Sequence, residues 1–216
     1  MARRRLGARA LGERGAVVVE AALVTPLLMA LLLGIIEVAL LMKDDVALTS
    51  AVRNGGRTAS ANAGAGPGGV DEGGDCISPC SPANVPKFAQ MAANAIQSAG
   101  SALPKDSIKE LWVYKANDKG YPGANGSTEM VCGTNCVKFK WIPNRTVPQF
   151  RYQSGTWTSS QVNACANNSP DSVGIYMRAQ HDFLTGFFTN HVDIEDHAVF
   201  AFEPLPTLTC ASGTHP

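Results

Sequence analysis

Imidazole and carboxylate side chains gather in one short stretch near the C-terminus, HDFLTGFFTNHVDIEDH. They are His181, Asp182, His191, Asp193, Glu195, Asp196 and His197. Such groups are metal ligands, and an extended backbone would turn His191, Asp193 and Glu195 to one side. The His-x-x-x-His spacing of helical zinc sites is missing, as are a phosphate loop and a dinucleotide fingerprint. We therefore favour a polar strand edge over a metal-dependent hydrolase, and expect no metal, no cofactor and no catalytic residue.

Cysteine is the second residue type that could do chemistry, and every cysteine follows a long apolar segment. The six cysteines are Cys76, Cys80, Cys132, Cys136, Cys165 and Cys210. CISPC and CGTNC share one spacing that zinc sites also use, but an even count in an exported domain favours disulfides. The Gly-Thr-Asn triplet could turn a hairpin that brings Cys132 to Cys136. The sequence leaves the other pairings open.

Two carboxylates, Glu20 and Glu37, stand in the apolar segment itself. If a helix enters a bilayer at Ala16, then Glu20 lies about 6 Å along it and Glu37 about 32 Å, near the two boundaries of a ~30 Å hydrocarbon core. Glu37 is then a membrane-interface acid close to Lys43. Glu20 has only apolar neighbours, and an intramembrane acid of this kind invites a partner from another chain.

The element that must position these acids is a membrane helix. Residues 16–42 form a nearly continuous apolar run, longer than the ~20 residues that cross a bilayer. A cleaved secretory signal would have a shorter core, about 7–15 residues, and a small-x-small cleavage site. Pro26 predicts a kink without further function. A stripe of small residues extends the helix to residue 61: Val46, Thr49, Val52, Gly56, Ala59 and Ala63.

A glycine-rich linker, residues 62–75, precedes an extracytoplasmic domain, residues 76–216. Residues 84–99 have the period of an amphipathic helix. The strand candidates are IKELWVYKA, MVC with CVKFKWI, FRYQSGTWTSS with a turn at 153–156, DSVGIYMRAQHDF and HAVFAFEP. These elements predict an α+β fold in which a packed helix covers an antiparallel sheet.

Charge sets the expected orientation. The formal net charge of the 216-residue chain is zero, but arginines crowd residues 1–15, the basic leader. Arginines beside a span are typical of the cytoplasmic side, so we expect a single-pass protein of the cytoplasmic membrane with its C-terminal domain outside. A nucleic-acid binder would carry its basic residues on the folded domain, so no nucleic acid is expected.

The order Arg14-Gly15, four apolar residues and Glu20 resembles the cleavage signal of Flp-type prepilins. With VALTSAVRNGGRTAS and the terminal DSVGIYMRAQHDFLTGFF and HAVFAFEP, the chain resembles the TadE-like family of minor pilins and pseudopilins of the Tad (tight adherence) pilus. The resemblance implies that a prepilin peptidase cuts between Gly15 and Ala16. It also implies that Glu20 pairs with the terminal amine of a neighbouring subunit.

The resemblance implies a pilin-like structural protein, not an enzyme, that takes part in assembly of a Tad/Flp-type pilus. Its partners would be other pilins or pseudopilins, the prepilin peptidase and membrane lipid. The alternative is a single-pass membrane protein whose disulfide-bonded exported domain binds a ligand or surface partner. Loss of residues 1–15 from the mature chain distinguishes these hypotheses.

Overall fold

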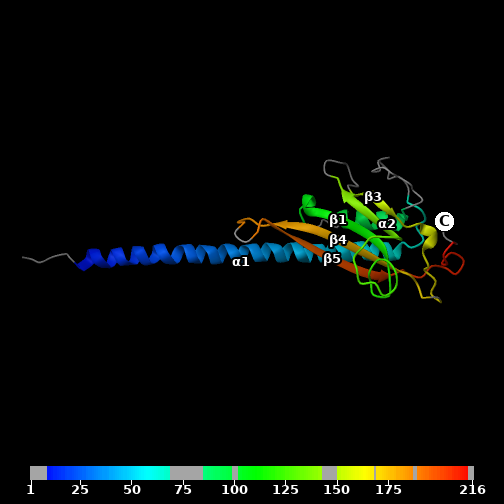
Figure 1. Cartoon of the computed structure of the whole chain (residues 1–216), viewed down its shortest axis with the longest axis horizontal. Coiled ribbons are helices and arrows are strands. Elements are labelled where there is room, and N and C mark those ends of the chain that lie inside the picture. Colours follow the sequence, from blue (N-terminus) through cyan, green and yellow to red (C-terminus); the bar gives the residue numbers. More distant parts are fainter. Residues whose placement is uncertain are drawn as a thin grey trace, which may run out of the picture.

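The computed structural model consists of one long helix and a compact domain built around its C-terminal half (Figure 1). It describes residues 9–68, 85–98, 102–142, 150–167, 169–186 and 189–213. The helices are α1 (Arg9–Ala61) and α2 (Lys87–Ser98), and short 3-10 turns cover Lys105–Ser107 and Ser159–Gln161. The strands are β1 (Ile108–Ala116), β2 (Cys136–Trp141), β3 (Phe150–Thr156), β4 (Ser172–Asp182) and β5 (His191–Ala201).

Helix α1 has 53 residues and begins at Arg9, inside the basic leader and seven residues before the predicted start at Ala16. It continues through Pro26 and ends at Ala61, as expected from the sequence. Within the described residues it is the one helix that is long and apolar enough to cross a membrane. Residues 15–32 are exposed on every side, and the domain covers one face of the helix from about residue 33 onward.

The five strands form one antiparallel sheet in the order β3-β2-β1-β4-β5. The predicted strand at 108–116 and the helix predicted over 84–99 are both present. The alternation in SVGIYMRAQHD is that of a strand as well, because Val173, Ile175 and Met177 point to one face. The predicted α+β fold is therefore confirmed.

Three details of the predicted sheet are wrong. Residues 153–156, predicted as a turn, continue β3 and pair with β2, and Gly155 takes a φ of +98° that glycine tolerates. Residues 130–132 are not a strand. Strand β5 begins at His191, six residues before the predicted start at His197. For 153–156 and for β5, pairing with the neighbouring strand overrides the local sequence pattern.

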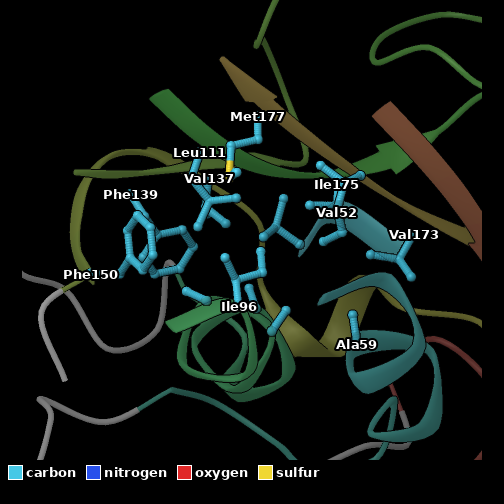
Figure 2. Packing of buried hydrophobic residues seen from close by; sticks show 14 of the residues in the cluster. Val52, Ala59, Ile96, Leu111, Val137, Phe139, Phe150, Val173, Ile175 and Met177 are labelled. Carbon is cyan, nitrogen blue, oxygen red and sulfur yellow. The ribbon is translucent and has the colours of Figure 1, made fainter. Parts of the chain in front are cut away.

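One face of the sheet packs on a layer made of α1 and α2. Helix α1 lies under β4 and β5, and α2 lies beside α1 near β1 and β3. Figure 2 shows Val52 of α1, Ile96 of α2 and Ile175 of β4 pointing toward one another. All three side chains are fully buried. The folded unit therefore includes the second half of α1 together with the chain that follows the predicted linker.

The linker predicted over 62–75 lies only partly within the described residues. Where it is described, the backbone of Gly68 donates to Val85 at 2.6 Å and Pro67 bridges to Pro86. These contacts join the end of α1 to the start of α2. The chain thereby brings two helices side by side under the sheet.

The opposite face of the sheet carries a smaller aromatic cluster of Trp112, Tyr114 and Tyr176, with the β1–β2 connection against it. The Tyr114 hydroxyl donates to the carbonyl of Gly120 at 3.0 Å, and Lys138 lies 4.3 Å above the ring of Trp112. Burial raises the pKa of Tyr114, so this phenol stays a neutral donor.

Close packing explains the glycine in the small-residue stripe. A β-carbon at Gly56 would overlap the ring of Phe200 on β5. Val52, Ala59 and Ala63 of the stripe are buried with it, whereas Val46 is exposed. Small residues therefore let the sheet approach this part of α1.

Replacement of Gly56 by alanine should lower the free energy of unfolding by about 1 kcal/mol. Overpacking costs ~1–3 kcal/mol and exceeds the ~1 kcal/mol that alanine gains over glycine in a helix. Gly34→Ala is the matched control, because a β-carbon there meets nothing within 4 Å. Denaturant unfolding of the full chain in detergent measures both. Equal midpoints for the two variants would contradict the packing explanation.

Candidate functional site

The candidate processing site, Gly15 and Ala16, lies within continuous helix. Both residues are exposed, and open space surrounds the α-carbon of Gly15. The side chains of residues 9–14 lie outside the described part of the structure. Gly15 and Ala16 are therefore exposed helical residues at the basic end of the apolar stretch.

Glu20 lies one helical turn beyond Ala16, in the same exposed part of α1. Val17, Val18 and Val19 precede it and are each more than 60% exposed. Within the described residues no hydrogen bond or ion pair joins Glu20 to another side chain. The exposed stretch of residues 15–32 is about 27 Å long, close to the hydrocarbon thickness of a bilayer. Glu20 therefore lies near one end of a stretch whose length suits a bilayer.

Glu37, the predicted membrane-interface acid, has a partner that the sequence analysis missed. Its carboxylate accepts hydrogen bonds from the backbone amides of Leu184 and Thr185, at 3.1 and 2.6 Å, and from the Thr185 hydroxyl at 2.8 Å. The residue is 6% exposed although its helix neighbours Ile36 and Val38 are open. We call this contact the Glu37 clasp. It ties the turn after β4 to α1.

A second acid on the same helix face holds the same hairpin. Asp44 Oδ2 lies 2.6 Å from Nδ1 of His181 in β4, and both side chains are nine-tenths or more buried. Glu37 and Asp44 are seven residues apart, two helical turns, so both face the sheet. That spacing is the sequence signal from which one could have predicted that both acids lie on the buried face of α1, where that face begins.

Of the six candidate disulfide cysteines, four lie within the described residues. Cys132 is bonded to Cys136, with the α-carbons 5.5 Å apart, and Cys165 to Cys210, with the α-carbons 4.7 Å apart. The first pair closes the turn that leads into β2, not the neck of a two-stranded hairpin. Cys76 and Cys80 lie outside the described residues.

Some of the histidine and acid residues of 181–197 have structural partners, among them His181 and Glu195. His191, Asp193 and Glu195 do alternate to the exposed side of β5. The Tyr176 hydroxyl donates to Glu195 at 2.7 Å, and burial together with this bond raises the pKa of Tyr176. Within the described residues, no three His, Cys, Asp or Glu side chains converge on a point that could hold a metal ion.

The comparisons with known proteins concern the same helix. The model of the family described as "TadE-like protein" matches residues 15–57. The match begins at Gly15 and includes Glu20, Glu37 and Asp44, and it connects this segment with the Tad pilus system. No curated protein and no solved structure matches the chain.

Proposed function

We propose, from the TadE-like character of residues 15–57, that this chain is a minor pilin or pseudopilin that takes part in assembly of a Tad/Flp-type pilus. The observation that supports it most is the position of Glu20, an exposed acid one turn into a fully exposed apolar helix. Such a helix needs an apolar environment, and its acid needs a cation. A role in assembly supplies both, and it is a structural role, not a catalytic one.

In this proposal the chain is first a single-pass protein of the cytoplasmic membrane. The arginine-rich leader, residues 1–15, stays on the cytoplasmic side and the sheet domain lies outside. A prepilin peptidase cuts after Gly15, so the mature chain begins at Ala16. The new α-amino group is a cation about 6 Å from Glu20 along the helix axis, one helical turn away.

The charge of Glu20 would then select where the helix docks. A poorly solvated carboxylate gains from an opposite charge, and a pair left with one partner is costly. The terminal amine of a neighbouring pilin can approach Glu20 when the two helices are side by side in correct register. The exposed apolar residues on both sides of Glu20 bury surface against the neighbour at the same time.

The test is Glu20→Gln in the full chain, expressed in cells with an active prepilin peptidase. For wild type we expect an intact mass that lacks residues 1–15 and a chain present in the sheared pilus fraction. For Glu20→Gln, we expect the amount in that fraction to fall at least about tenfold, because each ~1.4 kcal/mol of lost pairing is a factor of ten. Asp45→Asn, an exposed acid on the same helix, is the matched control.

Two results would contradict the proposal. Full-length protein in cells whose peptidase processes other pilins would favour the alternative, a membrane anchor for an exported ligand-binding domain. Undiminished incorporation of Glu20→Gln would remove the role of the carboxylate.

A further inference from the structure

The hairpin of β4 and β5 reaches farther along α1 than the rest of the sheet. Ile108 of β1 pairs with Ala179, and beyond that point β4 pairs only with β5 in the described structure. The last register pair is Asp182 with His191. Figure 1 shows this hairpin, in orange, running beside α1 toward the helix N-terminus. Within the described residues, the start of its turn, Leu184 and Thr185, is therefore the part of the domain nearest to the exposed apolar stretch of α1.

We propose that this turn rests in the lipid–water interface while the chain is in the membrane, with Leu184 in contact with lipid. The inference rests on the membrane placement in the proposed function and adds a second membrane contact to it. The Leu184 side chain is 73% exposed although leucine is among the most apolar residues. We call this contact the hairpin foot, defined by Leu184 and Thr185.

Helix length puts the foot at the right depth. From Ala16 to Glu37 the helix rises about 32 Å at ~1.5 Å per residue, which matches the ~30 Å thickness of a hydrocarbon core. The amides of Leu184 and Thr185 both donate to Glu37. The clasp therefore fixes the foot at the level where a ~30 Å hydrocarbon core that begins at Ala16 ends.

The clasp also explains how an acid can stand at this level. A carboxylate that leaves water needs its oxygens satisfied by donors. The foot supplies three donors at 2.6–3.1 Å, two amides and one hydroxyl. Those amides belong to a turn, whose backbone groups would otherwise need water. Each side of the contact thus satisfies the polar groups of the other where water is scarce.

We favour lipid over a second copy of the chain as the partner of the foot, because the foot is continuous with the membrane-facing stretch of α1. The foot adjoins the one surface of the chain that the proposal already assigns to the bilayer, the exposed rod that ends near Ile35 and Ile36. An apolar residue next to a span is expected at the level of the headgroups. Asp182 and Asp193 lie on the exposed side of the hairpin, so the contact suits a zwitterionic lipid surface.

The experiment introduces an indole at the foot and asks whether lipid reaches it. Full-length Leu184→Trp is reconstituted in vesicles of phosphatidylcholine with bromine on the upper part of one acyl chain, and fluorescence is compared with unbrominated vesicles. The native Trp112, Trp141 and Trp157 are at least nine-tenths buried in the domain. Wild-type protein therefore supplies the background. We expect Leu184→Trp to lose a larger fraction of its fluorescence than wild type and to emit at shorter wavelength.

Leu208→Trp is the matched control, because Leu208 is an exposed leucine (87%) in the C-terminal segment, which is drawn in red at the end of the domain away from the exposed stretch of α1 (Figure 1). We expect no quenching above wild type there. Equal quenching of the two variants, or none in either, would overturn the inference. A third outcome would also overturn the inference: a blue shift of Leu184→Trp that increases with protein density and is not accompanied by quenching. That result would mean that the foot contacts a second copy of the chain. If cleavage and incorporation are normal but the foot is not quenched, only this inference fails. If the foot is quenched but Glu20→Gln assembles normally, only the proposed function fails.

Discussion

Replacement of Asp44 by alanine is expected to lower the free energy of unfolding of the domain by about 3 kcal/mol, because one partner of a buried polar pair is lost. The side chains of His181 and Asp44 are 5% and 10% exposed, and 2.6 Å separates Nδ1 from Oδ2. Alanine leaves the imidazole buried with an unsatisfied nitrogen. Water cannot easily replace the carboxylate, since α1 and β4 pack against each other here.

Denaturant unfolding of the full chain in detergent, followed by the fluorescence of the buried tryptophans, measures this loss. Asp45→Ala is the matched control: the same substitution at the next residue, but on the exposed side of α1. Its effect should stay within about 0.5 kcal/mol. The double variant Asp44→Leu/His181→Leu removes both polar partners, so it should be more stable than Asp44→Ala. Equal stability of Asp44→Ala and Asp45→Ala would contradict the role of the pair.

The sequence predicted the elements best where a local period decides the structure. β1 has the predicted bounds, Ile108 to Ala116, because apolar and β-prone residues continue through it without a turn signal. α1 ends at the predicted residue, Ala61, because the stripe of small residues at helical spacing continues to that point in spite of Gly55 and Gly56. The α+β class follows from such elements without knowledge of any contact.

The same reasoning failed where the decisive partner is distant in the chain. Gly155 looks like a turn residue, but it lies in β3 against β2, where the backbone of Cys136 leaves no room for a side chain. Glu37 looks like an interfacial acid because its neighbours in sequence are apolar. Its actual partners, Leu184 and Thr185, are almost 150 residues away. No local pattern contains that contact.

The candidate site divides in the same way. Gly15 and Glu20 could be proposed from the sequence because their motif is a short local order of residues: glycine, four apolar residues and an acid. In the proposed function their partners lie on other molecules, so one chain can present the two residues but not pair them. Glu37 and Asp44, by contrast, act within the chain, and the fold had to be known before their roles could be described.

The loss of the Cys165–Cys210 disulfide is the second large effect that we expect. The bonded residues are 45 positions apart, and the segment between them contains both β4 and β5. In the chain-entropy model a closed loop of this length stabilises the fold by about 4 kcal/mol, because it restricts the unfolded chain. The Cys132–Cys136 pair closes a separation of 4, for which the same relation gives about 2 kcal/mol.

Two double variants therefore test the chain-entropy explanation as well as the size of the stability loss: Cys165→Ala/Cys210→Ala and Cys132→Ala/Cys136→Ala. Urea unfolding of each full-length variant should show the first to be less stable by about 2 kcal/mol. The native fold should persist, because backbone bonds still hold the C-terminal segment: Ala164 donates to Cys210 at 2.8 Å and Gly213 to Ser160 at 2.7 Å. Near-ultraviolet circular dichroism checks that point. Equal losses in the two variants would mean that native contacts at the sulfurs, and not the freedom of the unfolded hairpin, determine what each bond contributes.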